Sequence, residues 1–201
     1  MKISYNIIIM DNTVGSLTQL QRSLIIGSVL GDGHIRIIPG HKDAFLEIKH
    51  FLKAKDYVDW KYSVLKNICD SESKERETNE GRIVYCFFTK QDKEITEIYN
   101  LLYQDGKKII PKELEIDPIV LAVWLMDDGS KSNGNIYLNT QQFSMLDQKR
   151  LLHQLRQIGL NARLNRDKKY YRIRFLKESI PKLIEIVGPH IIPSMRYKIE
   201  L

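Results

Sequence analysis

The chain has 201 residues, 43% of them hydrophobic, which suits one sizeable domain or two small ones and excludes a disordered polypeptide. Its longest apolar runs are too short to span a bilayer, and no secretion signal opens the chain, so we expect no membrane association. The net charge of +6 is uneven: residues 131–201 hold 14 Lys and Arg against 5 Asp and Glu, whereas residues 1–130 hold 17 against 20. This basic second half indicates either a polyanionic partner or a solvated lysine-rich surface.

A helix is predicted over about residues 17–30, with Ser16 or Thr18 as its cap. Gly27 and Gly31 are four residues apart and therefore lie on one helical face. Each glycine inside a helix costs about 1 kcal/mol relative to alanine. We therefore expect a second backbone to pack closely against this face.

Turn residues and apolar patterns divide the rest of the first half into short elements. An apolar, strand-like segment without an assigned role precedes the helix at residues 1–15. After the helix we expect strands at 34–38 and 44–51, a helix at 53–68, an exposed polar turn at 70–81, a strand at 82–89, and a helix at 95–102 closed by Asp105-Gly106.

The second half repeats this order. A helix begins at Pro118 with Asp117 as its cap. We then expect a strand at 135–140, a helix at 147–158, a hairpin of strands 162–166 and 170–175, and a helix at 180–187. The acids that end the two apolar helices are 96 residues apart, and two Ile-Ile-Pro segments are 82 apart. We therefore predict an internal duplication and an α+β fold, with one repeat in residues 1–113 and the other in residues 114–201.

The two repeats each contain an apolar helix that ends in an acid and a glycine, as IIGSVLGDG and LAVWLMDDG. A carboxylate at the negative C-terminal end of a helix is unfavourable and calls for a positive partner. Duplicated units tend to pack about a pseudo-twofold axis, which would bring Asp32 and Asp128 together. Oxygen ligands without a histidine or thiolate favour Mg²⁺ over zinc. The sequence therefore predicts that the two acids share divalent metal.

Alternation along the predicted strands indicates a basic sheet face. Arg172 and Arg174 lie opposite the apolar Ile173 and Phe175, and Arg36 alternates with isoleucines in the same way. A polar, basic sheet face suits strands that read the major groove of DNA. Divalent ions beneath such a duplex could polarise a phosphodiester and activate water.

These features together resemble the LAGLIDADG homing endonucleases of the single-chain, two-repeat kind found in introns. The resemblance rests on IIGSVLGDGHIR, LAVWLMDDGSK, YLNTQQF, KKIIPKEL and HIIPSMRYK. It implies two αββαββα repeats, paired motif helices at their interface, and saddle-shaped antiparallel sheets over a long asymmetric DNA site. It also implies a monomer and Mg²⁺-dependent double-strand cleavage with short 3′ overhangs. An organelle genome would place the chain in a mitochondrion or chloroplast.

The resemblance also assigns roles by position. Asp32 and Asp128 match the metal ligands, with Gly31 and Asp127 as neighbours, and Lys108 and Lys198 match basic residues near the active sites. Gln141 would hydrogen-bond the water pocket or a base. The expected DNA contacts are Arg36, Lys49, Arg82, Lys131, Gln141, Arg163, Arg166, Lys168, Lys169, Arg172 and Arg174.

Three departures from an ideal duplication stand out. Val123 occupies the place of Gly27, so the two helices differ at their closest approach. Asp127 is an additional acid, which we expect to be exposed or to lie beside the metal without binding it. The acidic stretch 70–80 restricts DNA contact there to Lys74, Arg76 and Arg82.

Other functions fit the same scaffold. An RNA maturase that assists splicing of its own intron is the main alternative, and retention of both Asp32 and Asp128 favours the nuclease. A regulatory DNA-binding module would sooner have lost one of these acids. An α/β protein without nucleic-acid partners would leave the basic face unexplained.

Overall fold

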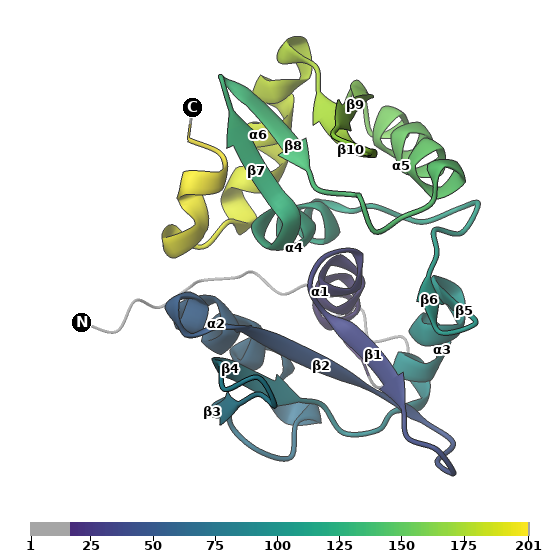
Figure 1. Ribbon diagram of the computed structural model, residues 1–201, viewed down its shortest axis with the longest axis vertical. Helices are drawn as coiled ribbons and strands as arrows, with labels where there is room; N and C mark the ends of the chain where they lie inside the picture. Colours follow the sequence, from purple (N-terminus) through teal and green to yellow (C-terminus); the bar gives the residue numbers. More distant parts are fainter. Residues whose placement is uncertain (1–16, 201) are drawn as a thin grey trace.

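A computed structural model describes residues 17–200 of the chain; the segment 1–15 considered above lies outside the described residues. Two halves of similar build are stacked along the long axis, the N-terminal half below and the C-terminal half above (Figure 1). Each consists of an antiparallel four-stranded sheet with helices packed on one face. The α+β prediction is confirmed. Among residues 17–200, no helix combines the length and the apolar character needed to cross a membrane.

The first sheet has the order β1-β2-β4-β3. Its strands are β1 (His34–Ile37), β2 (Ala44–Phe51), β3 (Lys74–Glu77) and β4 (Ile83–Phe88). Helices α2 (Lys55–Leu65) and α3 (Lys93–Leu102) pack on it, and short 3₁₀ turns at Leu52–Ala54 and Lys66–Ile68 flank α2. Ile35, Leu46, Ile48 and Phe87 are buried on the helix-facing side. The alternate residues of β1 and β2 face outward.

The second sheet has the equivalent order β7-β8-β10-β9. Its strands are β7 (Gly129–Ser132), β8 (Asn135–Leu138), β9 (Ala162–Asp167) and β10 (Tyr170–Phe175). Helices α5 (Met145–Gln157) and α6 (Ile180–Val187) belong to this half, and 3₁₀ turns lie at Lys177–Ser179, Gly188–His190 and Pro193–Lys198. The same strand order in both halves follows from the repeated pattern of the sequence.

Helices α1 (Gln19–Leu30) and α4 (Pro118–Asp128) lie side by side where the two halves meet (Figure 1). Thr18 caps α1 through a capping box, and the Asp117 side chain caps α4. A Cβ atom on Gly27 would lie 2.7 Å from the Val120 carbonyl oxygen and 2.8 Å from the Val123 Cβ. This close approach accounts for a glycine inside a buried helix.

Two expectations about the first half are wrong. The stretch 70–81 is not only a turn, because it contains the edge strand β3, whose four residues are all exposed. An exposed, charged edge strand has no apolar alternation by which it could be recognised. Asp105-Gly106 does not close α3 either: the helix ends at Leu102, and the pair forms the tip of a small hairpin of β5 (Tyr103–Gln104) and β6 (Lys107–Lys108). Both tip residues have positive φ, as tight hairpin turns require.

We predict that Gly27→Ala lowers the free energy of unfolding by about 1–3 kcal/mol, the usual range for overpacking a filled core. The added methyl group would meet the α4 backbone, which cannot move without separating the helices. Gly188→Ala is the matched control, because its Cβ would have no neighbour within 4 Å and its φ is −53°. Urea denaturation measures both. Equal stability of the two variants would contradict tight packing of α1 on α4.

Candidate active site

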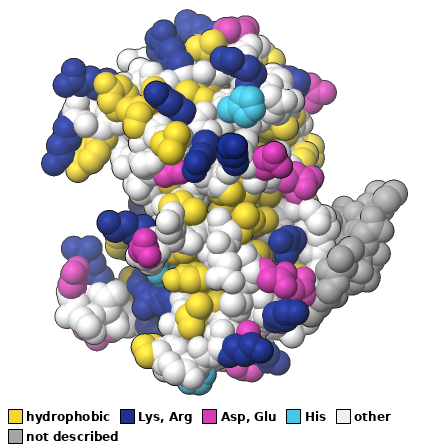
Figure 2. Space-filling view, turned by 90° about the vertical axis from the view of Figure 1, so that its right-hand side faces the viewer, with side chains coloured by type: hydrophobic (Ala, Val, Ile, Leu, Met, Phe, Trp, Pro, Cys, Tyr) yellow, Lys and Arg dark blue, Asp and Glu magenta, His cyan; other side chains and the backbone are white. Residues whose placement is uncertain are grey.

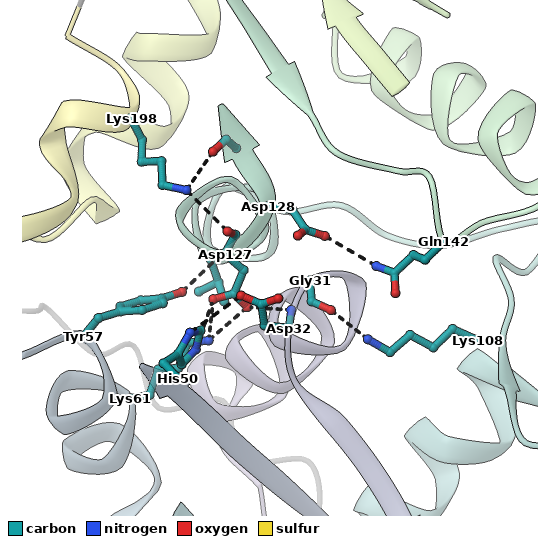
Figure 3. Close-up of polar contacts among 12 residues, drawn as sticks. Gly31, Asp32, His50, Tyr57, Lys61, Lys108, Asp127, Asp128, Gln142 and Lys198 are labelled. Carbon is teal, nitrogen blue, oxygen red and sulfur yellow. Dashed lines mark hydrogen bonds and ion pairs between the residues drawn. The ribbon is translucent and has the colours of Figure 1, made fainter. Parts of the chain in front are cut away.

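The candidate site lies where α1 and α4 end (Figure 3). Asp32 follows α1 by two residues and Asp128 is the last residue of α4, so both carboxylates sit at the negative ends of helix dipoles. Lys108 and Lys198 approach from opposite sides. The Lys108 ammonium donates to the Gly31 carbonyl at 2.7 Å, and Lys198 donates to the Gly129 carbonyl at 2.7 Å and the Asp127 carbonyl at 3.3 Å. Each lysine thus supplies positive charge to one helix C-terminus.

The acids of the site hold their protons more tightly than usual. Burial, followed by the charges of Asp32 and Asp127, raises the pKa of Asp128 to about 8. Burial and then the charge of Asp127 raise the pKa of Asp32. The pKa values of Lys108 and Lys198 are lowered, chiefly because burial disfavours the charged ammonium. The raised pKa values show that negative charge on Asp32 and Asp128 is unfavourable, so a cation bound between them would be stabilised.

Asp127 is not exposed, so of the two expectations stated for it only the position beside the metal remains. Its side chain is fully buried, as is that of Lys61 on α2, whose ammonium donates to both carboxylate oxygens at 2.9 and 3.0 Å. The Lys61 ammonium also lies 4.4 Å above the centre of the Tyr57 ring. The Asp32 backbone N–H points at the Asp127 carboxylate at 3.4 Å. Asp127 therefore links the end of α4 to the first repeat.

His50, at the end of β2, stands between two of the acids. Its Nδ1 is 3.6 Å from the Asp32 carboxylate and its Nε2 is 3.6 Å from that of Asp127. Burial, followed by the charge of Lys61, lowers the pKa of His50 to about 4. The imidazole is therefore neutral at neutral pH, and these contacts are not ion pairs under those conditions.

Sequence reasoning missed Lys61 and His50, although one signal for Lys61 was present. Tyr57, Lys61 and Leu65 are four residues apart on α2, so Lys61 sits in the middle of a stripe that is otherwise buried. A lysine on the buried face of a helix needs an acid as its partner. His50 gave no comparable signal, because the predicted strand 44–51, which matches β2, does not reveal what packs beside its last residues.

Gln142 rather than Gln141 reaches the acids. The Gln142 amide nitrogen donates to the Leu30 carbonyl at 3.1 Å and lies 3.4 Å from the Asp128 carboxylate. Gln141 instead donates to the Asp167 carboxylate at 3.3 Å, beside the second sheet. The water-pocket role considered for Gln141 therefore suits its neighbour better.

The predicted DNA contacts of the second repeat do not share one surface. Strand register sets Arg163 opposite Arg174 on the outer face, together with Arg172. Lys131 is paired with the buried Ile136, and so belongs to the helix-facing side. Arg166 lies between two outward-facing residues of β9 and therefore also belongs to the helix-facing side. Lys168 and Lys169 form the turn between β9 and β10.

In the first repeat, the predicted cations already have acidic partners. Arg36 and Lys49 both pair with Glu47, at 2.8 and 3.5 Å, and Arg82 pairs with Glu80 at 3.3 Å. Figure 2 shows a hollow on one side of the molecule between the two halves, with Lys and Arg side chains on the projections above and below it.

We predict that Lys61→Met destabilises the fold by about 3–5 kcal/mol, because it leaves the buried Asp127 carboxylate without its partner. The double variant Lys61→Met/Asp127→Asn removes both charges and should recover most of that loss. Lys66→Met, which removes an exposed lysine just after α2, is the control and should change little. Chemical denaturation compares the three. If Lys61→Met lowers the free energy of unfolding no more than Lys66→Met does, the buried pair does not hold the two halves together as described.

Comparison with known proteins identifies the family of the chain. The model of the LAGLIDADG DNA endonuclease family matches residues 22–183. The cytochrome b mRNA maturase bI2 of Saccharomyces cerevisiae is 31% identical, and the alignment covers 94% of this chain and 49% of that protein. The probable intron-encoded endonuclease 1 of Wickerhamomyces canadensis is 27% identical, over 92% of this chain and 85% of that protein.

Among solved structures, the chain is similar to the homing endonuclease I-WcaI bound to its DNA recognition sequence. The TM-score is 0.85 at 26% identity, and the match covers 93% of this chain and 88% of that one. This chain spans about half the length of the yeast maturase. The family match extends over most of the chain and confirms the resemblance seen in the sequence. The chain therefore belongs to the LAGLIDADG DNA endonuclease family.

Proposed function

We propose that this chain is a site-specific homing endonuclease. It binds a long, asymmetric duplex DNA site as a monomer and makes a metal-dependent double-strand break with short 3′ overhangs. The observation that carries the proposal is the pair of acids, Asp32 and Asp128, at the adjoining ends of α1 and α4, each helix end with its own half-buried lysine. The similarity to I-WcaI, a structure that contains DNA, supports the choice of substrate.

The residues of the site suit Mg²⁺. Asp32 and Asp128 would hold it, because carboxylate oxygens are hard ligands and both acids are crowded by like charge. When bound, such an ion lowers the pKa of water and polarises a phosphodiester. Around it, Lys108 and Lys198 supply positive charge for the phosphate, and the Gln142 amide orients a water molecule beside Asp128.

Each repeat would serve one half of the DNA site. Residues 1–113 and 114–201 are the corresponding units, and each contributes one sheet, one acid and one lysine. Asp32 is contacted by His50 and by the Asp127 carboxylate, whereas Asp128 is approached by the Gln142 amide, so the surroundings of the two acids differ. The two strands would therefore be cut at unequal rates.

A second candidate function is assistance of intron splicing. It is favoured by the similarity to the yeast cytochrome b mRNA maturase, which covers nearly all of this chain. Gel-shift titration with intron RNA and with duplex DNA distinguishes the two. Tight binding of the RNA together with no binding of any duplex would replace the nuclease proposal.

We predict that Asp32→Asn and Asp128→Asn each reduce double-strand cleavage at least about 100-fold while duplex binding persists, because each removes a charge that would hold the metal. Asp105→Asn is the control, since that acid lies at the tip of the β5–β6 hairpin and not in the site. The assay incubates each protein with Mg²⁺ and a library of duplex targets. A wild-type protein that binds tightly and never cuts, or variants that cut normally, would refute the mechanism.

We also predict that Mg²⁺ binding strengthens as the pH rises toward 8. Below its pKa of about 8, Asp128 carries a proton that must leave before a cation binds. The apparent affinity should therefore fall about tenfold for each pH unit below that value. Calorimetric titration of the DNA-free protein between pH 6 and pH 9 measures this slope. Asp128→Asn should lose the part of the slope near pH 8, and an unchanged slope would exclude Asp128 as its source.

A further inference from the structure

The outer faces of the two sheets differ in chemistry. On the first sheet, register places Phe45, Phe51, Val84, Cys86 and Phe88 on the outer face of β2 and β4; we call these five residues the apolar strip. Phe51 is 58% exposed, and the rings of Phe45 and Phe88 lie 6.2 Å apart. Most of the strip lines a groove that also contains Asp32, so the groove leads along the sheet to the candidate active site.

The charged groups of this face are arranged around the strip and are largely paired. Glu47 forms ion pairs with both Arg36 and Lys49. The Arg76 guanidinium lies 4.7 Å above the Phe88 ring at the edge strand β3, which places it at the rim of the groove. A cation at the rim suits phosphate contact, which positions the duplex without reading its sequence. Val84 and Cys86 are buried, at 8% and 1% exposure, so the three phenylalanines of the apolar strip are the part of this face that remains available for base edges.

The outer face of the second sheet is polar throughout. Register places Arg163 and Asn165 on β9 beside Arg174 and Arg172 on β10. The Arg172 and Arg174 side chains are half-buried on this face, and the Arg172 Nε lies 4.0 Å from the Asp167 carboxylate at the end of β9. Tyr137, the aromatic residue of this face on β8, lies under the Arg172 guanidinium at 4.1 Å. Hydrogen-bond donors are therefore what this face offers to a base.

We propose that the two repeats read their halves of the DNA site by different chemistry, building on the proposed function. The apolar strip of the first repeat contacts thymine 5-methyl groups, the only apolar groups that base pairs present in the major groove. Arg172 and Arg174 of the second repeat donate to guanine O6 and N7, the acceptor pair that arginine recognises. Sensitivity to methyl groups therefore belongs to one half of the site, and sensitivity to guanine N7 belongs to the other.

Base analogues test this directly. A duplex is first selected from a random library on the wild-type protein in EDTA, so that binding is selected without cleavage. Thymidines are then replaced by deoxyuridine in one half of the site at a time. Deoxyuridine pairs with adenine as thymidine does but lacks the 5-methyl group. We expect binding to weaken about fourfold for each contacted thymine in one half only, the value of one buried methyl-sized group. Replacement of guanine by 7-deazaguanine should weaken binding in the opposite half.

Protein variants assign the halves without a structure of the complex. Phe51→Ser should abolish the deoxyuridine effect and keep the 7-deazaguanine effect, and Arg174→Gln should do the reverse. Leu146→Ser is the control, because Leu146 is equally exposed, at 58%, but lies on α5. If deoxyuridine weakens binding in both halves or in neither, or if its effect persists in Phe51→Ser, this inference is wrong while the proposed function stands. If the library yields no bound duplex, the proposed function fails and this inference fails with it.

Discussion

The contact of α1 with α4 is the constraint on which the rest of the molecule depends. Gly27 lets the two backbones meet, and as a result two helix C-termini, each with a carboxylate, end at the same place. Such an arrangement is electrostatically unfavourable by itself. Lys108 and Lys198 offset part of the cost by donating to the terminal carbonyl groups. Burial, followed by the remaining negative charge, raises the pKa of Asp128, so a cation bound there would be stabilised.

The duplication is symmetric in topology and asymmetric in chemistry. The repeats share strand order, and Lys108 and Lys198 contact equivalent helix ends. Where the first repeat has Gly31, the second has Asp127, which is buried against Lys61 of the other half. A buried pair of this kind adds little net stability but is costly to break, so it fixes how the halves meet.

The same asymmetry extends to the sheets. The first presents an apolar strip whose neighbouring cations pair with Glu47, and the second presents Arg163, Arg172 and Arg174, with Asp167 beside Arg172. A palindromic site would need two equal faces, whereas these faces suit an asymmetric one. The uneven charge of the two halves of the sequence thus has a structural counterpart, in which the basic half carries the donor-rich sheet.

The sequence by itself determined the repeats, the family, the helix caps and the glycine contact, because periodicity and capping are local. It also singled out Asp32, Asp128, Lys108 and Lys198 through the resemblance, and the structure brings all four together. Only the tertiary structure decided that Lys61 and His50 join them, that Gln142 rather than Gln141 lies beside Asp128, and that Lys131 turns away from the outer face. These depend on which segments pack opposite a helix or beside the end of a strand. A periodic pattern gives the face on which a residue lies, but not the partner that this face will meet.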